Sequence, residues 1–319
     1  LGIVELTMAL HLVLDFLKDQ LIFDVGHQSY THKLLTGRRE GFVELRKFGG
    51  MSGFPKRNES HYDAFDTGHS STSISLAIGM AKARELKKEK NNVFAVIGDG
   101  ALSGGMAFEA LNNAARLKSN LVIVLNDNQM SISKNVGGMS KYLGNIRTST
   151  NYTEFKEDVE TKLRKSHIGN ALADSIKGAK DAVKRLFVPG MLFEDMGITY
   201  IGPIDGHDVK QMVSAFESAS KMQKAVIVHV CTKKGKGYLP AEEDPSAFHG
   251  IAPFKPSDGT LKNKEKYLTY TYVFSRKMVE LADKDEKIVA ISAAMPSGTG
   301  LNRMAERFPD RFFDVGIAE

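Results

Sequence analysis

Two short motifs and the distance between them place the strongest constraint on the fold of this chain. They are Gly98-Asp99-Gly100 and Asn126-Asp127-Asn128. The apolar run 93–97 precedes the first motif and the run 121–125 precedes the second, a pattern typical of buried parallel strands. Between them, apolar residues recur at helical spacing over 106–117. The sequence therefore predicts a strand–helix–strand unit with a right-handed crossover.

The two motifs place oxygen-bearing side chains just after both strands. Because parallel strands end at the same edge of a sheet, where open α/β folds bind ligands, we expect Asp99 and Asn128 to lie side by side. Carboxylate and carboxamide oxygens suit Mg²⁺, which completes its shell with water and substrate phosphate oxygens. Gly98 and Gly100 would let the backbone approach that phosphate, and the following helix would direct its N-terminus there. The unit is interpreted as a site for Mg²⁺ and a diphosphate group.

Other phosphate-binding motifs fit less well. A dinucleotide fingerprint requires a third glycine where this chain has Ser103, and no P-loop sequence with its lysine is present. An aspartate between two glycines is by itself most often a turn. The helix, strand and Asn-x-Asn that follow make the pair of motifs resemble the diphosphate motif of thiamine diphosphate enzymes.

The composition indicates a globular protein of the α/β class. With 319 residues, 42% of them hydrophobic, the chain can build one large or two smaller domains. The single cysteine, Cys231, excludes an internal disulfide framework, suits a reducing cytosol and is expected to be a buried side chain, not a nucleophile. No apolar run is long enough to cross a membrane. The basic residues do not form a stripe interleaved with aromatic residues, which argues against nucleic-acid binding. The net charge of +5 is compatible with a phosphorylated ligand.

The remaining patterns predict a diphosphate-binding domain over 1–251, a linker over 252–266 and the start of a second α/β domain over 267–319. Within the first domain, 134–185 predicts a mobile excursion over the site, with a helical insertion as the alternative. Because Leu1 is not an initiator methionine and the chain stops in a predicted strand, we expect a fragment. Further helices are predicted over 1–14, up to about 88, and over 168–186, 209–221, 270–283 and 301–308, and further strands over 21–25, 225–230, 287–292 and 312–317.

Histidine, hydroxyl and lysine side chains also approach the predicted ligand edge. His27 follows the strand over 21–25, while Gly68-His69-Ser70 precedes the helix that ends near 88. The Ser and Thr residues there are expected first as helix caps and second as anion ligands. The segment 33–57 predicts a basic, glycine-rich connection, either near a ligand or on the surface. Lysines over 232–238 would either neutralise a phosphate or belong to a solvated turn.

Over nearly its whole length the chain resembles the 1-deoxy-D-xylulose-5-phosphate synthase family, a transketolase-like group that depends on thiamine diphosphate and Mg²⁺. The resemblance implies a parallel-sheet thiamine diphosphate-binding fold, with the diphosphate-binding domain followed by the beginning of the pyrimidine-binding domain. The motifs that carry it are Asp24-Val25-Gly26-His27-Gln28-Ser29-Tyr30, Gly50-Met51-Ser52-Gly53-Phe54-Pro55-Lys56-Arg57, Gly68-His69-Ser70-Ser71-Thr72-Ser73, Asn126-Asp127-Asn128-Gln129-Met130-Ser131-Ile132-Ser133, Tyr200-Ile201-Gly202-Pro203-Ile204-Asp205-Gly206-His207, Phe248-His249-Gly250 and Asp314-Val315-Gly316-Ile317-Ala318-Glu319.

The same resemblance implies a set of site residues. His27 and His249 would assist proton transfers, and Glu319 would hydrogen-bond the aminopyrimidine ring of the cofactor. The implied Mg²⁺ ligands are Asp99, Asn128 and the backbone carbonyl of Met130. The implied cofactor-binding residues are His27, Gly68, His69, Ser70, Gly100, Ala101, Asn128, Tyr238 and Glu319.

The implied reaction condenses pyruvate with glyceraldehyde 3-phosphate, with loss of CO₂, to give 1-deoxy-D-xylulose 5-phosphate for isoprenoid, thiamine and pyridoxal biosynthesis. A cytoplasmic homodimer without nucleic-acid or membrane partners is expected. Ser297 stands where the family pattern has Asp, and the basic residues expected to bind the aldehyde phosphate would follow Glu319. The fragment is therefore expected to bind cofactor but not to complete a turnover alone.

Three alternatives remain from the sequence. The chain could be a transketolase or another thiamine diphosphate enzyme, which a comparison of pyruvate with a ketose phosphate as donor would decide. It could be a cofactor-binding subunit that needs a partner chain. A phosphoryl-transfer enzyme that uses Asp99 is disfavoured by the missing P-loop lysine.

Overall fold

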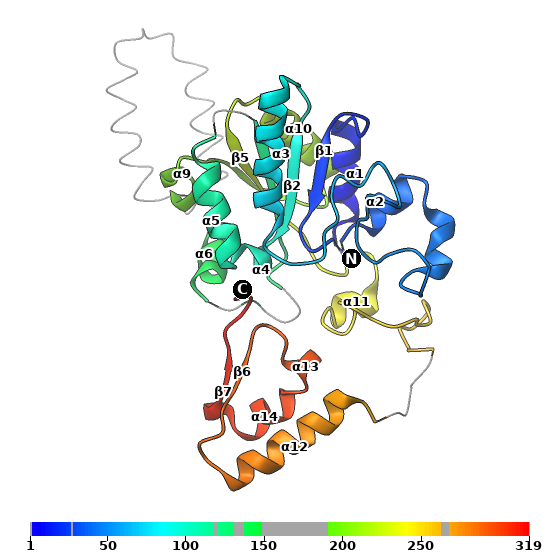
Figure 1. Cartoon of the computed structure of the whole chain (residues 1–319), viewed down its shortest axis with the longest axis vertical. Helices are drawn as coiled ribbons and strands as arrows, with labels where there is room; N and C mark the ends of the chain where they lie inside the picture. Colours follow the sequence, from blue (N-terminus) through cyan, green and yellow to red (C-terminus); the bar gives the residue numbers. More distant parts are fainter. Residues whose placement is uncertain are drawn as a thin grey trace.

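The computed structural model describes residues 2–26, 28–117, 120–130, 135, 137–148, 191–262 and 268–318. His27, Glu319, the predicted helix 168–186 and most of the predicted excursion 134–185 lie outside these residues. The described part of the chain contains a five-stranded sheet covered by helices on both faces and a smaller unit with a two-stranded sheet (Figure 1).

All strands of the large sheet are parallel, in the order β1-β2-β3-β5-β4. Their bounds are β1 Gln20–Phe23, β2 Val93–Gly98, β3 Leu121–Asp127, β4 Thr199–Asp205 and β5 Ala225–Cys231. Gly98 pairs with Asn126 in the ladder between β2 and β3. The two sequence motifs therefore lie at the same edge of the sheet, as predicted.

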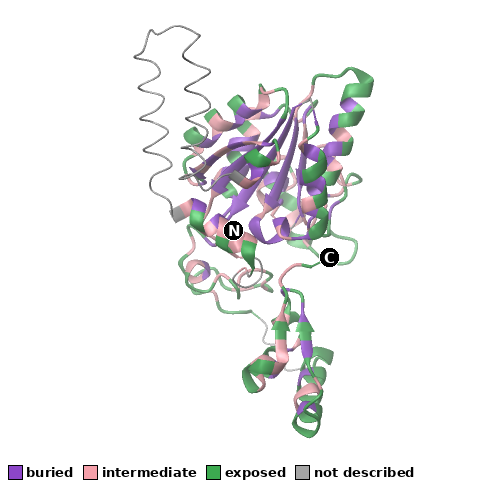
Figure 2. Cartoon of the chain, turned by 90° about the vertical axis from the view of Figure 1, so that its left-hand side faces the viewer, coloured by how far each residue is buried: buried purple, intermediate pink, exposed green. Residues whose placement is uncertain are grey.

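Strand burial explains the long apolar runs, because both faces of the sheet are covered. Val93, Ala95 and Ile97 pack toward one helical layer, whereas Phe94 and Val96 pack toward the other. Figure 2 shows the strands buried along most of their length. The first layer contains α3 (Ser73–Lys87) and α5 (Gly105–Ala114), and the second contains α1 (Val4–Val13) and α10 (Val209–Ser220).

The starts of three helices can be compared with the sequence patterns that precede them. Asp208 directly precedes the predicted helix 209–221 and caps α10, because its carboxylate accepts a hydrogen bond of 3.0 Å from the Gln211 N–H. The predicted hydroxyl cap of α3 is wrong, since Thr72 makes no such side-chain bond. Asp99 does not close β2 but begins a separate short helix, α4 (Asp99–Leu102), ahead of α5. The helix predicted over 106–117 corresponds to α5, and α4 is an additional short helix between it and β2.

The connection predicted over 33–57 is more structured than its composition suggested. It begins within α2 (Tyr30–Leu35) and contains a 3₁₀ helix, η1 (Arg39–Glu44). The side chain of Lys33 is fully buried, with Nζ 2.6 Å from Glu59 Oε2 and 2.8 Å from the Ser52 carbonyl. Elements this short leave no clear periodicity, so the sequence pattern could not identify them.

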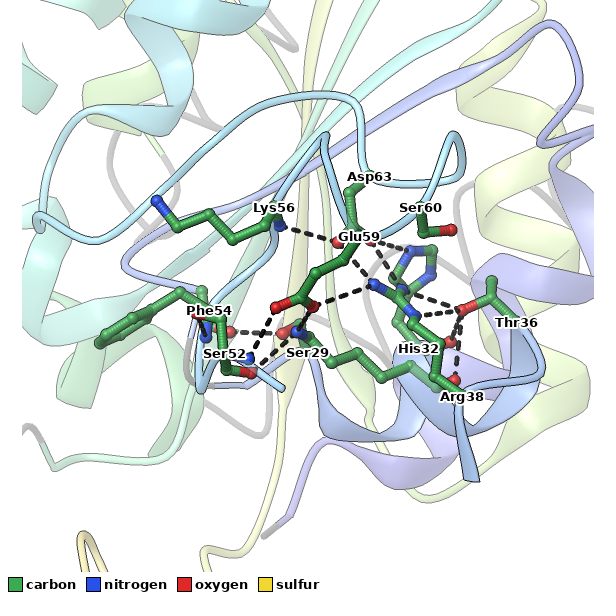
Figure 3. A network of polar contacts seen from close by, with 12 residues as sticks. Ser29, His32, Thr36, Arg38, Ser52, Phe54, Lys56, Glu59, Ser60 and Asp63 are labelled. Atoms are coloured by element: carbon green, nitrogen blue, oxygen red, sulfur yellow. Dashed lines mark hydrogen bonds and ion pairs between the residues drawn. The ribbon is translucent and has the colours of Figure 1, made fainter. Parts of the chain in front are cut away.

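A second salt bridge ties the same connection to α2. Arg38 donates two hydrogen bonds of 2.7 Å to Asp63, and His32 lies 3.2 Å from the same carboxylate (Figure 3). Burial alone would raise the pKa of Asp63, but the hydrogen bonds from His32 and Arg38 bring it well below its usual range. The carboxylate therefore stays ionised in the buried network.

The smaller unit is an incompletely covered α/β layer. Its strands β6 and β7 are parallel and shorter than predicted, and the side chains of Ile291 and Phe313 are exposed. A small core contains Ala282, Ala290, Leu301 and Met304. The elements are α12 Tyr270–Lys284, β6 Ala290–Ser292, α13 Pro296–Thr299, α14 Asn302–Arg307, η2 Pro309–Arg311 and β7 Phe312–Asp314.

Shorter elements complete the described chain: α6 (Gly138–Thr148), α9 (Met191–Asp195) and α11 (Leu239–Glu243). Part of the predicted linker is packed, because Phe254 pairs with Leu261 and its ring lies 5.3 Å from that of Phe248. Across the described ranges, no helix has the length and apolar character needed to cross a membrane.

Candidate functional site

A cavity of about 550 Å³ lies at the edge of the large sheet where β2 and β3 end. Residues of both units line it, and Figure 1 places the C-terminal end of the chain next to α4. The lining side chains are mixed polar and apolar, as in many cofactor sites. They include Asp24, Val25, Gln28, Gly98, Asn126, Lys234, Phe248, Ala294, Met295, Ile317 and Ala318.

The cavity also brings together most of the residues predicted from the sequence. The predicted residues that line it are Gly68, His69, Ser70, Gly100, Ala101, Asn128, Met130 and His249. Asp99 is buried at the start of α4, directly before the lining residue Gly100. Tyr238 does not line the cavity, and His27 and Glu319 lie outside the described residues. The residues directly before Glu319 do contribute to the wall.

Asp99 lies beside a second buried carboxylate, that of Asp127 at the end of β3. Burial and the charge of Asp127 raise the pKa of Asp99 to about 8. Asn135 donates a hydrogen bond of 2.8 Å from Nδ2 to Asp99 Oδ2. A carboxyl group whose ionisation is opposed by burial and by a neighbouring carboxylate is suited to exchange its proton for a cation.

Asp127 has its own positive partners and is therefore less suited to bind a metal. Arg147 Nη1 lies 2.7 Å from Asp127 Oδ1, and His229 Nε2 lies 3.1 Å from Oδ2. Burial opposes ionisation, but the hydrogen bond from His229 and the charges of His229 and Arg147 lower the pKa of Asp127. Tyr200 completes the chain, with its hydroxyl 2.7 Å from His229 Nδ1.

The side chains of Asp127, His229 and Cys231 come close enough together to suggest a separate metal site. The charges argue against it, because Arg147 already pairs with Asp127. Burial and the nearby Asp127 carboxylate also raise the pKa of the Cys231 thiol to about 12, so no thiolate is available near neutral pH. The raised pKa agrees with the prediction that Cys231 is not a nucleophile, but the side chain is half-buried and not fully buried as predicted.

The backbone around the cavity is strained at several non-glycine residues. Val25, Ser71, Gln129 and Ala294 have φ values of 59°, 67°, 65° and 59°. Val25 and Ala294 line the cavity, whereas Ser71 and Gln129 are directly next to lining residues. Left-handed conformations at such residues cost energy and are concentrated at functional sites.

The segment that carries Gly68-His69-Ser70 is held in place by buried contacts. The Asp24 carboxylate accepts hydrogen bonds from the N–H groups of Ser71, at 2.9 Å, and Ser73, at 3.0 Å. Ser71 Oγ donates to the carbonyl of Ala101 at 2.8 Å. Gly104 allows this approach, since a Cβ there would lie 2.2 Å from Ser71 Oγ. Three segments of the cavity wall are thus joined.

The sequence reasoning missed the specific positions of Asp24, Gln28 and Lys234. Asp24 was part of a matching motif, but its role in binding the start of α3 depends on a contact across 47 positions. Lys234 belongs to the predicted lysine-bearing loop, and its side chain lies at the cavity wall in contact with His249. Which lysine of that loop faces the cavity could not be read from composition.

The residues present fit a bound Mg²⁺–diphosphate group. Asp99 provides the buried carboxyl group in need of a cation, and Asn128 provides a carboxamide at the same sheet edge. Lys234 supplies a positive charge to the cavity wall from the loop after β5. The Tyr238 hydroxyl is buried without a hydrogen-bond partner among the described residues. The site therefore combines hard oxygen donors with a cationic side chain.

Comparison with known proteins gives a consistent result. Residues 1–232 match the family described as 1-deoxy-D-xylulose-5-phosphate synthase, and residues 266–319 match the pyrimidine binding domain of transketolase. Proteins named 1-deoxy-D-xylulose-5-phosphate synthase from Lachnoclostridium phytofermentans and Desulfitobacterium hafniense are 62% and 57% identical over this whole chain. The chain spans 51% of the length of each of these relatives.

Solved structures show the same fold at much lower identity. A transketolase variant from Pichia stipitis is similar with a TM-score of 0.55 at 17% identity, over 97% of this chain and 43% of that one. Transketolase from Campylobacter jejuni gives a TM-score of 0.52 at 19% identity, over 95% of this chain and 41% of that one. The predicted α/β fold is thereby confirmed as transketolase-like.

Proposed function

The chain belongs to the 1-deoxy-D-xylulose-5-phosphate synthase family, and on this basis we propose that it forms the Mg²⁺ and thiamine diphosphate site for a decarboxylating condensation. The substrates are pyruvate and glyceraldehyde 3-phosphate, and the products are 1-deoxy-D-xylulose 5-phosphate and CO₂. The product would serve isoprenoid, thiamine and pyridoxal biosynthesis. The observation that carries the proposal is that Gly68, Gly100 and Asn128, from three separate segments, line one cavity, and that the buried Asp99 directly precedes Gly100.

Asp99 and Asn128, with the carbonyl oxygen of Met130, hold Mg²⁺ in this proposal. The metal then offsets the buried negative charge of Asp99, which burial and Asp127 disfavour in its absence. Lys234 stabilises the negative charge of the diphosphate from the loop after β5.

Further side chains orient the cofactor and the substrate. Gly68, His69, Ser70, Gly100 and Ala101 shape the wall next to the cofactor, and Tyr238 supports that wall through ring contact with Phe248. Bound thiamine diphosphate supplies the carbanion stabilisation that loss of CO₂ from a 2-oxo acid requires.

The proton-handling residues are proposed as His249, His27 and Glu319. His249 lines the cavity wall, where an imidazole can exchange protons with substrate oxygens. The roles of His27 and Glu319 rest on the resemblance of their motifs, with Glu319 as hydrogen-bond partner of the aminopyrimidine ring.

We also propose the domain division 1–251, 252–266 and 267–319. The separate family matches to 1–232 and 266–319 support it.

A homodimer is proposed because apolar side chains of the smaller unit, including Val273, Ile291 and Phe313, are exposed and would be covered by association. Light scattering should then give twice the chain mass of 35.1 kDa, and a monomer at micromolar concentration would contradict this. A cytoplasmic location is proposed because a sequence with a single cysteine, Cys231, suits a reducing compartment.

Calorimetric titration of the chain with thiamine diphosphate tests the proposed site. Binding with 1:1 stoichiometry is expected with Mg²⁺, together with a large loss of affinity in EDTA. Thiamine without the diphosphate serves as the matched ligand and should bind much more weakly. Tighter binding of ADP than of thiamine diphosphate, or binding indifferent to Mg²⁺, would overturn the proposal.

A donor assay separates the proposed reaction from that of transketolase. The chain, with thiamine diphosphate and Mg²⁺, is supplied with glyceraldehyde 3-phosphate and with pyruvate or xylulose 5-phosphate as donor. Any turnover should require pyruvate and release CO₂. Turnover of the ketose phosphate in its place would assign the other reaction.

A further inference from the structure

Lys234 and His249 form a contact within the cavity wall that the proposed function leaves without a role. Lys234 Nζ lies 2.9 Å from His249 Nδ1, and both residues line the cavity. Lys234 follows β5, whereas His249 lies beyond α11, so the contact joins two separate segments.

Packing fixes the positions of both residues. The loop of Lys234 is held against α11, because Gly235 lies so close that a Cβ would be 2.4 Å from the Ala241 carbonyl oxygen. Glu242 pairs with Lys233 and accepts a hydrogen bond of 2.8 Å from the Gly237 N–H. These contacts fix the loop on both sides of Lys234.

The segment of His249 is held equally well. The neighbouring ring of Phe248 lies 5.6 Å from that of Tyr238 and 5.3 Å from that of Phe254. The His249 N–H donates to the Ser246 carbonyl at 3.2 Å. The aromatic cluster therefore fixes the segment from which the His249 imidazole contacts Lys234.

The chemistry of the contact decides which imidazole nitrogen carries a proton. A lysine ammonium has three donors and no acceptor, so the Nδ1 atom that it contacts must offer a lone pair. Burial and the charge of Lys234 lower the pKa of His249 to about 4, which leaves the ring neutral at pH 7. Burial lowers the pKa of Lys234 to about 8 against the opposing charge of Asp99, so most of the amine is still protonated at pH 7. The remaining proton of the ring must then be on Nε2.

We propose that Lys234 is a positioning residue that holds His249 as the neutral tautomer protonated at Nε2, so that the imidazole is a hydrogen-bond donor in the cavity. The preferred substrate group at His249 is then an acceptor oxygen, such as a carboxylate, a carbonyl or a developing alkoxide. If the proposed function holds, this group belongs to the 2-oxo acid or the aldehyde. His249 begins the reaction as a donor and not as a base.

The tautomer can be measured directly in the unmodified chain. Long-range ¹H–¹⁵N spectra of ¹⁵N-histidine-labelled protein at pH 7 distinguish a protonated from an unprotonated ring nitrogen, and His249→Gln assigns the signal. The expected spectrum shows an unprotonated Nδ1 and a protonated Nε2. A protonated Nδ1 would overturn the proposal without any need for a variant at Lys234.

Variants at Lys234 then test its role. Lys234→Met should convert His249 to a mixture of tautomers and raise its measured pKa by at least one unit, whereas Lys234→Arg should keep the Nε2–H form. Lys236→Met, an exposed lysine on the same loop, is the matched control and should change neither. An unaltered tautomer in a folded Lys234→Met protein would contradict the proposal.

The test is separable from that of the proposed function. If the Nε2–H tautomer is present but thiamine diphosphate does not bind, the proposed function fails and the inference about Lys234 survives. If the cofactor binds with Mg²⁺ but His249 carries its proton on Nδ1, the inference fails alone.

Discussion

Asp24 Oδ1 accepts a hydrogen bond of 2.9 Å from the Ser71 N–H, across 47 positions of sequence. Asp24 Oδ2 accepts a second bond from the Ser73 N–H, so one carboxylate joins the end of β1 to the start of α3. Both of these segments contribute to the cavity wall. The contact explains how the strained turn at Ser71 is maintained.

Asp24→Ala should weaken both the fold and the site. Loss of a buried acceptor for two N–H groups is expected to lower the free energy of unfolding by about 1–3 kcal/mol. Release of the segment 68–71 should lower thiamine diphosphate affinity by about tenfold, which corresponds to roughly 1.4 kcal/mol. Urea unfolding and calorimetry measure the two effects. The exposed Asp310→Ala is the control, and equal cofactor affinity in Asp24→Ala would show that the contact does not position the site.

Asp99→Asn should separate metal binding from folding. The substitution removes a buried acidic group from beside Asp127, so we expect the free energy of unfolding without metal to be unchanged or higher. The affinity for thiamine diphosphate in the presence of Mg²⁺ should fall by more than about 100-fold. This exceeds the loss of about 10- to 100-fold that is typical of residues that only contact a metal ligand. Calorimetry with and without EDTA gives the Mg²⁺ dependence. Retention of that dependence would remove Asp99 from the proposed ligands.

Lys33→Met should be strongly destabilising, because it leaves the half-buried Glu59 with only the more distant Arg38, at 3.8 Å, as a positive partner. The expected loss in the free energy of unfolding is about 3–5 kcal/mol. The double variant Lys33→Met/Glu59→Leu should recover much of it, which a double-mutant cycle by urea unfolding would show. Lys47→Met breaks the exposed pair with Glu44 and should change stability by less than about 0.5 kcal/mol. Comparable losses at Lys33 and Lys47 would contradict the importance of burial.

Stability should fall as the pH decreases from about 6.5 to about 4. Burial and the neighbouring His32 lower the pKa of His11 from 6.5 to about 4, so in this window the unfolded chain binds more protons than the folded chain. The free energy of unfolding therefore rises with pH here and levels off above 6.5. His249 acts in the same direction. His11→Gln should flatten part of the slope in thermal unfolding, while the exposed His61→Gln should leave it unaltered, and an unaltered slope in His11→Gln would refute the assignment.

Much of the sheet could be predicted from the sequence, because both of its faces are buried. The apolar runs that form β2 and β3 have no polar interruption, that of β5 is broken only by the buried His229, and the Asp99 and Asn128 motifs directly follow the first two runs. The parallel ladder then necessarily brings those motifs to one edge, as the pairing of Gly98 with Asn126 shows. Short elements such as α2 and α4 have no such periodicity and were missed or misplaced.

By itself, the sequence determined where the apolar runs of β2, β3 and β5 lie and which oxygen donors follow β2 and β3, since apolar runs and chain order are local properties. Only the tertiary structure decided which distant side chains meet. Asp24 contacts Ser71, Lys234 contacts His249, and Lys33 is buried against Glu59. In each pair, packing of the whole core brings together segments that are apart in the sequence. No local sequence pattern predicts which donor will contact which acceptor.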